Sequence, residues 1–441
     1  MIFLYKIALN ILFIISLPFL PFFYFFSDKR RAGLFRRFGF RTGLTPEQTG
    51  KRRIWIHALS VGEVISSVPF VKALKEQFKD LDIVFTASTK TGFDMADQLF
   101  LKKIYSSNDS ALVDQLGYFP YDLACCVKKI SQQIKPDAVV IVETDLWPNF
   151  LYEMEKKGIP VVLINARLSK RSLKGYLLFK KFSLMFFSSL TQIMAQTSLD
   201  EERFQRLGID ENKISVMGNI KFDQPVTDMN QSRIAGIRDR LGIREETQVF
   251  VAGSTHEGEE IILCEAYKRA RNDSPGLLMI IAPRDPKRCP SILSYFLSND
   301  IPAVSMSELD ASNNNFNSRS EIVLVDKMGE LSRLYAICDV AFIGGSMIKQ
   351  GGHNPLEAAA FSKPVLFGSD MSDFLFISTM LMDQGGAKMV DSEQDLRKEL
   401  EIILTNRQVQ DYRGRQNFEV FSKNCGAVQR IIKNLEHLEI V

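Results

Sequence analysis

The strongest constraint on the fold is a repeated alternation between short apolar runs and segments of helical period. Five β-branched runs of strand length lie in the first half of the chain, with amphipathic stretches between them. The runs span residues 54–59, 81–87, 137–143, 159–165 and 191–196. Continuous apolar strands joined by helices are typical of a parallel sheet covered on both faces. This half of the chain therefore predicts a doubly wound α/β domain.

A second alternating set follows a break in the pattern. Residues 218–232 (GNIKFDQPVTDMNQS) are rich in Gly, Pro, Asn and Asp and have no period, which is typical of a linker. Beyond the linker, strand-length runs recur at 248–254, 277–283, 321–326, 340–344 and 364–367. The 441 residues are enough for two full cores. We predict two Rossmann-like domains, residues 28–222 and residues 223–441.

The N-terminal segment is strongly apolar. Residues 7–26 (IALNILFIISLPFLPFFYFF) contain no charged residue, and a helix of that length would just cross a bilayer core of about 30 Å. We expect residues 1–27 to be a membrane anchor. Pro18 and Pro21 leave a shallow or re-entrant anchor as the alternative to a spanning helix.

A basic block follows this apolar segment. Between Asp28 and Arg53 the chain has nine Lys and Arg against two acidic residues, so the block carries +7 and the rest of the chain sums to −4. By the positive-inside rule, we expect the part of the chain that follows this block to lie on the cytoplasmic side. It also suggests a partner that carries phosphates or anionic headgroups. A solvated charged linker is the alternative.

The stretch IGGSMIKQGGHNPLEAAA (343–360) has the features of a nucleotide-binding loop. Its glycines lead into a helix start, where Asn354 suits the N-cap and Pro355 suits the first helical position. A glycine-rich approach to a helix N-terminus is a favourable phosphate site. Glu357 suits a capping box, and it also suits a hydrogen bond to a ribose diol. We favour the nucleotide over a plain loop.

Two further strand ends in the second half carry suitable groups. Arg284, in APRDPKR, follows a strand and can hold a phosphate through two parallel hydrogen bonds, although a surface salt bridge is equally compatible. In DKMGELSRLY, the N–H groups of Met328, Gly329 and Glu330 precede another helix. The convergence of these helix starts on one anion or nucleotide is more informative than any single motif.

In the first domain, charged residues follow the corresponding strands. Glu63 in SVGE completes a Ser-x-x-Glu capping box with Ser60, or it is a carboxylate placed at the sheet edge to accept a proton. Glu143 follows four consecutive aliphatic residues and is either a hydrogen-bonding network member or catalytic. Lys221 in GNIKFD either neutralises charge in a cleft or forms an ion pair at the hinge.

Several other chemistries lose support. The spacing of His57, His256 and His353 is not that of metal ligands, so we expect no metal. Because His57 lies inside a predicted strand, we expect it to be a core histidine with its hydrogen bonds satisfied. The chain has no Gly-x-Ser-x-Gly elbow, no Walker A motif and no Gly-x-Gly-x-x-Gly motif, which disfavours ATP hydrolysis and hydride transfer. The six cysteines form no C-x-x-C pair and fit a reducing compartment. We expect no cofactor and no nucleic-acid partner.

Taken in order, these segments resemble the 3-deoxy-D-manno-octulosonic acid (Kdo) transferase family of lipid A and lipopolysaccharide biosynthesis. The segments that carry the resemblance are IWIHALSVGE, ETDLWPN, INARLSKRS, GNIKFD, AGSTHEGEE, APRDPKR and GGHNPLEAAAFSKPVLFG. The resemblance runs from the N-terminal anchor to about residue 375. It implies a GT-B glycosyltransferase fold, with two Rossmann-like domains facing a cleft.

The resemblance also implies an activity. It implies an inverting, metal-independent transfer of Kdo from CMP-Kdo to the lipid A precursor lipid IVA, at the inner face of the cell inner membrane. Glu63 would be the general base, and Glu143 and Lys221 would support the transition state. The residues implied to bind CMP are Pro283, Arg284, Met328, Gly329, Glu330, Asn354, Pro355, Leu356 and Glu357.

Three alternatives stay open on the residues alone. A nucleotide-sugar epimerase or hydrolase would use the same two-domain fold, but a soluble substrate needs neither the anchor nor the basic block. A transferase with another nucleotide-sugar donor would carry the same glycine-rich motif. A membrane-bound nucleotide sensor would bind CMP without turnover.

Overall fold

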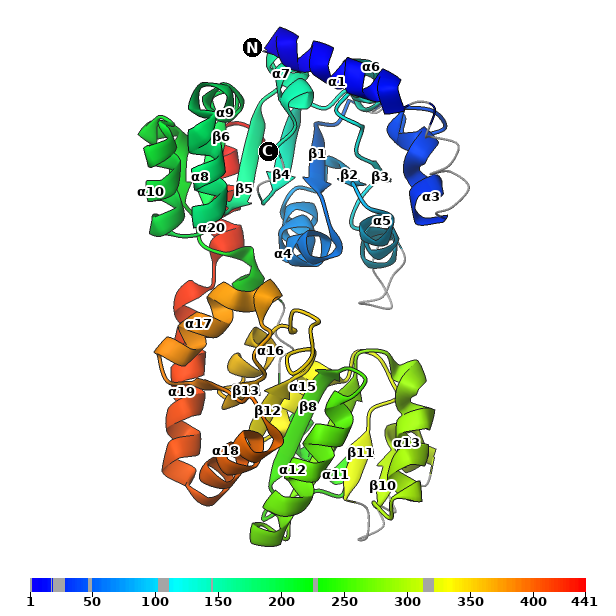
Figure 1. The fold of residues 1–441 in the computed structure, drawn as a ribbon, viewed down its shortest axis with the longest axis vertical. Coiled ribbons are helices and arrows are strands. Elements are labelled where there is room, and N and C mark those ends of the chain that lie inside the picture. Colours follow the sequence, from blue (N-terminus) through cyan, green and yellow to red (C-terminus); the bar gives the residue numbers. More distant parts are fainter. Residues whose placement is uncertain are drawn as a thin grey trace. The chain divides into compact units, whose positions relative to one another are not determined.

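The computed structural model describes residues 2–16, 18, 28–46, 50–101, 111–143, 146–224, 229–311 and 321–441, with the backbone alone for residues 28–32. The chain divides into two units (Figure 1). Unit 1 comprises Met1–Gln224 and Cys425–Val441, and unit 2 comprises Pro225–Asn424.

Unit 1 is built on a seven-stranded parallel sheet of order β3-β2-β1-β4-β5-β6-β7. Its strands are β1 (Arg53–Ala58), β2 (Asp82–Ala87), β3 (Gln115–Tyr118), β4 (Ala138–Val142), β5 (Val161–Ala166), β6 (Gln192–Ala195) and β7 (Ile214–Val216). The sheet grows from β1 to one side, then restarts at β4 on the other side. The order therefore reverses between β1 and β4.

Helices lie on both faces of this sheet. The helices of unit 1 are α1 (Ile2–Ser16), α3 (Asp28–Arg37), α4 (Val61–Gln77), α5 (Lys90–Ala96), η2 (Asp97–Leu101), α6 (Ala124–Ile134), α7 (Pro148–Lys156), α8 (Lys170–Leu178), α9 (Lys180–Phe187), α10 (Ser198–Leu207), η3 (Glu211–Lys213), η4 (Ile220–Asp223) and α20 (Ala427–His437). Successive residues of β1 serve opposite faces. Ile54 and Ile56 pack in the core under α4 and α20, whereas Trp55 packs in the core under α6, α7, α9 and α10.

Unit 2 repeats this architecture with a sheet of order β10-β11-β9-β8-β12-β13-β14, again parallel. Its strands are β8 (Val249–Thr255), β9 (Leu278–Pro283), β10 (Ala303–Ser305), β11 (Ile322–Leu324), β12 (Val340–Ile343), β13 (Val365–Phe367) and β14 (Ala387–Met389). Its helices are α11 (Gln231–Arg240), α12 (Glu259–Asp273), η5 (Pro286–Arg288), α13 (Cys289–Ser298), α14 (Met306–Ala311), α15 (Leu331–Ile337), α16 (Leu356–Ala359), η6 (Ser372–Phe374), α17 (Leu375–Asp383), α18 (Glu393–Thr405) and α19 (Arg407–Asn424). The order reverses between β8 and β12. Two parallel-sheet α/β domains are thus confirmed, and they are consistent with a GT-B fold.

The C-terminus corrects one expected domain boundary. We expected residues 223–441 to form the second domain, but Cys425–Val441 belongs to unit 1. The physical reason is the apolar stripe of α20, whose buried members Ala427, Val428, Ile431, Ile432 and Leu435 complete the core beneath β1. Because these residues recur at helical spacing, one whole face of α20 is buried.

The N-terminal helix α1 docks on unit 1. The Tyr5 hydroxyl donates to Asp122 Oδ2 (2.9 Å), and the Lys6 ammonium lies 3.9 Å from the centre of the Tyr152 ring. Residues 1, 17 and 19–27 of the expected anchor lie outside the described residues. Within the part of the chain that the structure describes, no helix combines the length and the apolar character that a membrane span requires.

Part of the expected basic block has a structural role. Arg53 is 1% exposed, and its Nε donates to Asp82 Oδ2 (2.9 Å). Arg37 Nε donates to the carbonyl oxygen of Phe119 (3.0 Å), and the guanidinium lies 4.1 Å from the centre of the Tyr121 ring. These two cations hold strand starts and loops of unit 1, so they are not free surface charges for a partner.

Candidate functional site

The order reversal in unit 1 places two predicted residues after neighbouring strands. Ligands of doubly wound sheets bind beyond the carboxyl ends of the strands where the order reverses. In unit 1 these strands are β1 and β4, which pair directly. Glu63 lies in the first turn of α4, which follows β1, and Glu143 follows β4 immediately. Both carboxylates therefore belong to the edge where a ligand is expected.

The contacts of Glu63 differ from the predicted capping box, in which its carboxylate would accept a hydrogen bond from the backbone N–H of the N-cap residue Ser60. Ser60 is the N-cap residue of α4, with extended backbone, but its side chain makes no capping hydrogen bond. The Glu63 carboxylate instead accepts a hydrogen bond from the backbone N–H of Leu59. Glu63 is half-buried. Its carboxylate is thus held at the junction of β1 and α4 with part of its surface accessible.

Glu143 and Lys221 are brought together. The Lys221 Nζ atom lies 3.8 Å from Glu143 Oε1, and the two side chains are 20% and 24% exposed. Glu143 adopts a left-handed backbone (φ 62°), which costs a residue with a Cβ about 1–3 kcal/mol. Its N–H donates to the carbonyl oxygen of Ile164 (2.9 Å), which helps to hold this conformation. Strain of this kind is concentrated at functional sites.

The glycine loop after β12 is held by a carboxylate that the sequence analysis did not single out. Glu259 is 0% exposed and accepts hydrogen bonds from the N–H groups of Gly345 (2.7 Å), Ser346 (3.0 Å) and Met347 (3.0 Å). It also accepts from the N–H of His256 (2.9 Å). Glu259 therefore ties the end of β8 to the end of β12, at the order reversal of unit 2. The motif THEGEE directly after a strand was the available signal.

Glycine is required at the start of this loop. A Cβ atom on Gly344 would lie 2.4 Å from the carbonyl oxygen of Ser254, and a Cβ on Gly368 would lie 2.3 Å from the carbonyl oxygen of Ser346. Both contacts are to backbone, so neither is easily relieved. The close approach of these segments leaves the loop after β12 little freedom to move.

Two histidines meet beside this loop. His256 Nε2 and His353 Nε2 are 2.9 Å apart, and the rings are nearly parallel, at 7°. Burial, Arg284 and His256 together lower the pKa of His353 to about 4, so one neutral ring donates to the other. A shared hydrogen bond between imidazoles occupies both Nε2 atoms.

Glu357 lies in a half-buried position near Arg284. Burial raises the pKa of Glu357 to about 7, while the positive charge of Arg284 acts in the opposite direction. Arg284 itself is exposed, directly after Pro283 at the end of β9, and its N–H donates to the carbonyl oxygen of Thr255 (2.9 Å). A carboxyl group with a pKa near neutrality beside an arginine is typical of a binding or catalytic site.

The helix start at Asn354 differs slightly from the prediction. The side-chain oxygen of Asn354 accepts from the N–H of Leu356 (3.1 Å), as a capping residue does. Pro355 takes the N-cap position, because α16 begins at Leu356 and ends at Ala359. The helix start is therefore one residue later than expected, and the helix is short.

Met328, Gly329 and Glu330 form the turn before α15. Met328 is 73% exposed, Gly329 has a left-handed backbone (φ 86°), and Glu330 is the N-cap residue. The Glu330 carboxylate lies 3.6 Å from the Arg240 guanidinium, so its side chain is engaged within unit 2. The predicted contact of this turn with a ligand was through its backbone N–H groups, and the engagement of the Glu330 side chain leaves that prediction untouched.

His57 is a core histidine, as predicted. It is 0% exposed, and its ring stacks on Phe119 with centres 3.8 Å apart. Its Nδ1 lies 3.0 Å from the carbonyl oxygen of Thr86. His57 therefore has a packing role and leaves the chemistry to other residues.

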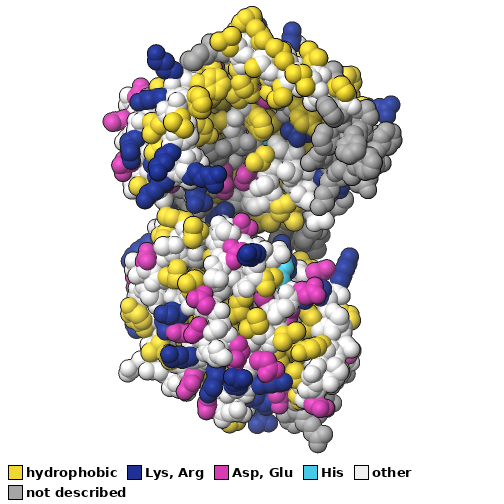
Figure 2. Space-filling model, in the orientation of Figure 1, with side chains coloured by type: hydrophobic (Ala, Val, Ile, Leu, Met, Phe, Trp, Pro, Cys, Tyr) yellow, Lys and Arg dark blue, Asp and Glu magenta, His cyan; other side chains and the backbone are white. Residues whose placement is uncertain are grey.

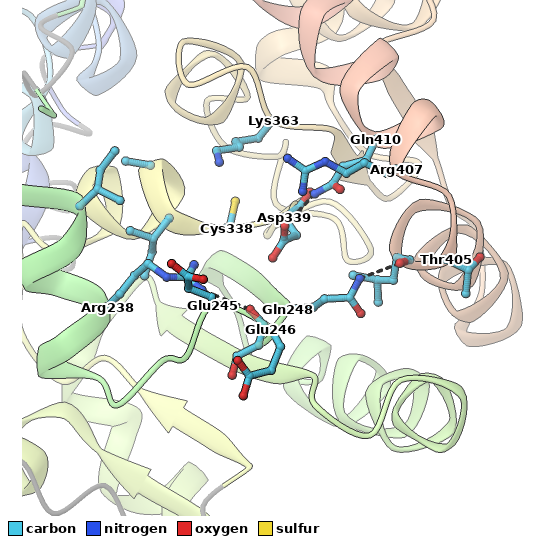
Figure 3. A pocket seen from close by; sticks show the side chains of 15 residues that line it. Arg238, Glu245, Glu246, Gln248, Cys338, Asp339, Lys363, Thr405, Arg407 and Gln410 are labelled. Carbon is cyan, nitrogen blue, oxygen red and sulfur yellow. Dashed lines mark hydrogen bonds between the residues drawn. The ribbon is translucent and has the colours of Figure 1, made fainter. Parts of the chain in front are cut away.

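A cavity of about 540 Å³ in unit 2 lies at the opposite edge of the sheet (Figure 3). Gln248 and Asp339, which precede β8 and β12, line it together with Lys363 and Gln410. Gln410 Nε2 donates to Asp339 Oδ1 (2.8 Å), and Gln248 Nε2 donates to the carbonyl oxygen of Leu404 (2.6 Å). Ligands of such folds bind at the carboxyl edge, so this cavity is separate from the candidate site.

Comparisons with known proteins point to one family. The family model described as 3-deoxy-D-manno-octulosonic-acid transferase (kdotransferase) matches residues 32–224. A 3-deoxy-D-manno-octulosonic acid transferase of Haemophilus influenzae is 32% identical over 412 residues, which cover 93% of this chain and 92% of that protein. A protein of the same name from Rickettsia bellii is 30% identical over 368 residues, which cover 83% of each chain.

A solved structure supports the fold. The UDP-GlcNAc 2-epimerase of Neisseria meningitidis, bound to UDP-GlcNAc, gives a TM-score of 0.56 and covers 87% of this chain and 100% of its own. The two sequences are 15% identical, so the likeness concerns the fold alone.

Proposed function

Because this chain belongs to the Kdo transferase family and is a glycosyltransferase, we propose that it transfers Kdo from CMP-Kdo to the lipid A precursor lipid IVA. The observation that carries the proposal is the gathering of Glu63, Glu143 and Lys221 at the order reversal of unit 1. The transfer proceeds with inversion and without a metal, as the family resemblance implies.

Glu63 is the general base of this mechanism. An acceptor hydroxyl is a weak nucleophile, and a positioned carboxylate that removes its proton contributes about 10²–10⁴-fold to the rate. The hydroxyl oxygen attacks the anomeric carbon of Kdo, the bond from that carbon to the CMP phosphate oxygen breaks, and CMP leaves with the electron pair. The proton passes to Glu63. The Glu63 side chain is partly exposed, and its carboxylate accepts a hydrogen bond from the backbone N–H of Leu59. Both observations support a carboxylate that is fixed and accessible to the acceptor.

Glu143 and Lys221 support the transition state. Negative charge develops on the departing phosphate as positive charge develops on the sugar, and preorganised charges stabilise both. The ion pair at 3.8 Å offers one charge of each sign in a half-buried setting, where electrostatic interactions are stronger than in water.

Unit 2 holds the donor. Glu357 accepts hydrogen bonds from the ribose hydroxyls, and Arg284 neutralises the phosphate. Two further groups of residues complete the CMP site. One is the backbone of the turn at Met328, Gly329 and Glu330. The other consists of Pro283, Asn354, Pro355 and Leu356. The coupling of Arg284 to the pKa of Glu357 supports their proximity within one site.

The protein binds the cell inner membrane from the cytoplasmic side. Hydrophobic side chains gather over α1 (Figure 2), where Phe3 and Leu4 are each 69% exposed. Tyr5 of α1 and Phe182 of α9 are in ring contact, and the α8–α9 connection exposes Leu178 (80%) and Phe179 (71%). Exposed cations flank this connection at Arg171, Lys174, Lys180 and Lys181. Apolar side chains with flanking cations suit an anionic lipid surface.

Co-sedimentation with phosphatidylglycerol-containing vesicles tests the membrane proposal. Replacing Leu178 and Phe179 with Glu should lower the bound fraction, and neutral vesicles should bind less than anionic ones. The change Leu297→Glu, at an exposed leucine of unit 2, is the control and should have no effect. Equal binding of all variants would contradict the assigned surface.

A second experiment tests the reaction class. The protein is incubated with CMP-Kdo, with and without lipid IVA, and free CMP is measured. A transferase releases CMP in proportion to the lipid supplied. Release at the same rate without lipid would favour a hydrolase, and CMP binding without release would favour a sensor.

A further inference from the structure

Three buried amide side chains link the ends of β5 and β6 to the segment that carries Lys221. Asn165, Gln196 and Asn219 are 0%, 7% and 7% exposed. Gln196 Nε2 donates to the carbonyl oxygen of Asn165 (2.9 Å), and Asn219 Nδ2 donates to Gln196 Oε1 (3.2 Å). A continuous chain of hydrogen bonds therefore runs from the sheet edge to η4.

This chain of amides holds the first turn of η4. Asn165 Oδ1 accepts from the N–H of Ile220 (3.1 Å), and Asn219 Oδ1 accepts from the N–H of Lys221 (2.9 Å). Two N–H groups at the start of the turn thus have side-chain partners instead of water. The backbone of Lys221 is fixed in consequence, and from there its ammonium lies 3.8 Å from Glu143.

The same strand ends fix Glu143. Its N–H donates to the carbonyl oxygen of Ile164, the residue before Asn165 (2.9 Å). The register of β5 against β6 shifts between Leu163 and Ala166, and Asn165 has a left-handed backbone (φ 53°), as Glu143 does. Bulges of this kind redirect side chains and are frequent beside active sites.

Asn165 also carries a buried polar atom without a partner. Its Nδ2 has no hydrogen-bond partner among the residues that the structure describes. The orientation of the amide is set, because the N–H of Ile220 requires an acceptor. Burying an unpaired donor is unfavourable, so its retention calls for an explanation. The explanation is that the N–H of Ile220 requires Asn165 Oδ1 as its acceptor, even though Nδ2 of the same amide is left without a partner among the described residues.

We propose that Asn165, Gln196 and Asn219 are positioning residues for the transfer reaction, a role that rests on the proposed function of Lys221 and Glu143. They hold η4 against the ends of β4 and β5 so that the Lys221 ammonium faces the Glu143 carboxylate. The three amides act through these two residues and are distinct from the groups that hold the donor in unit 2.

The change Asn165→Gly tests the proposal with little backbone strain. Glycine adopts a φ of 53° freely, so the change removes the amide and keeps the conformation. Because small misplacements of a catalytic group are costly, kcat should fall roughly 10- to 100-fold. The KM for CMP-Kdo and the affinity for CMP should not change. An unchanged kcat would overturn the proposal.

Variants of Asn219 give a second route that avoids the left-handed position. Asn219→Ala removes the acceptor for the N–H of Lys221 and should also lower kcat. Asn219→Ser keeps a neutral oxygen at this capping position, without placing a carboxylate against Gln196 Oε1, and should restore part of the rate. Equal loss in both variants would contradict a role for this hydrogen bond.

The decisive comparison places Asn165→Gly in a Lys221→Met background. If Asn165 acts through Lys221, its removal lowers kcat in the wild type and has no further effect in Lys221→Met. An equal further loss in both backgrounds would overturn the proposal. If Lys221→Met retains full turnover, the proposed function of Lys221 fails first. If only Asn165→Gly retains it, the positioning role alone fails.

A buried asparagine of unit 2 is the matched control. Asn417 is 0% exposed, its Nδ2 donates to the carbonyl oxygens of Lys363 and Gly386 (2.8 Å each), and its Oδ1 has no partner among the described residues. Asn417→Ala should lower thermal stability and leave kcat unchanged. A similar loss of kcat in Asn417→Ala would show that destabilisation alone explains the effect.

Discussion

The two units share one topology and differ in chemistry. Each has a seven-stranded parallel sheet. The strand order reverses between β1 and β4 in unit 1 and between β8 and β12 in unit 2. In unit 1, the residues beyond this reversal are Glu63, Glu143 and Lys221, which are charged side chains. In unit 2, the corresponding loop begins with two glycines, and the buried Glu259 accepts hydrogen bonds from the N–H groups of Gly345 and Ser346.

This difference shows that the topology specifies where a site lies and the local sequence specifies what it does. Charged side chains with partial exposure suit proton transfer and charge stabilisation. The exposed cation of Arg284 and the carboxyl group of Glu357 suit the binding of the phosphate and the ribose of a nucleotide. We therefore expect variants of unit 1 to change kcat and variants of unit 2 to change donor affinity.

Among the substitutions, Glu63→Gln should cause the largest loss of kcat. Glutamine can still accept the N–H of Leu59, but it cannot take a proton, so kcat should fall by about 10²–10⁴-fold while the fold and the CMP affinity are retained. Steady-state kinetics, thermal unfolding and CMP titration check this. Glu76→Gln, at an exposed glutamate of the same helix, is the control. Near-normal turnover would show that Glu63 is only a capping residue.

The substitution Lys221→Met should cause the second-largest loss of kcat. Loss of one preorganised charge should lower kcat by about 10²-fold without changing CMP binding. Lys72→Met removes an exposed lysine of α4 and should have no effect. A variant that lost stability but kept its kcat would favour the alternative, in which the pair with Glu143 is only a structural ion pair.

Glu357→Gln should act on the donor. A hydrogen bond to a charged group contributes about 1.5–3 kcal/mol, so the Kd for CMP should rise by roughly 10- to 100-fold. Because the pKa of Glu357 is raised to about 7, CMP binding to the wild type should also weaken as pH falls from 8 to 6. Calorimetric titration measures both. Glu265→Gln, at an exposed site of unit 2, is the control. An unchanged Kd would remove Glu357 from the donor site.

The smallest effect is the influence of Glu357 on stability. Its pKa is about 7 in the folded protein against an ordinary value of 4.5, so the folded state holds a proton that the unfolded chain releases between these values. Stability should therefore decrease as pH rises from 4.5 to 7. Glu357→Gln removes this dependence, so its thermal midpoint should exceed that of the wild type by a few degrees at pH 8 and by less at pH 5. The reverse order would contradict burial of the carboxyl group.

The central strands were predictable from the sequence, whereas the edge strands were not. Long apolar runs such as 137–143 indicated β4 because a strand buried on both faces needs them. The outermost strands β3, β7, β10 and β14 are three or four residues long, and the sequence patterns indicated none of them. An edge strand needs few apolar residues, so its pairing depends on the neighbouring strand more than on its own sequence.

The same limit applies to the candidate site. Glu143 was found because it follows a strand, which sequence patterns locate well, and Lys221 was found because it lies in the predicted linker at the domain hinge. Glu259 and Asn165 act by holding loops that lie 86 and 55 residues away in the chain. A local pattern can place such a residue after a strand, as THEGEE does for Glu259, but it does not encode which distant loop the residue holds.

The most direct test of the account is mass spectrometry of lipid IVA after reaction with CMP-Kdo and the full-length protein. We predict a lipid product that is heavier by one or more Kdo residues, with free CMP formed in step and no product from Glu63→Gln. Release of CMP while the mass of the lipid stays unchanged would contradict the transfer reaction.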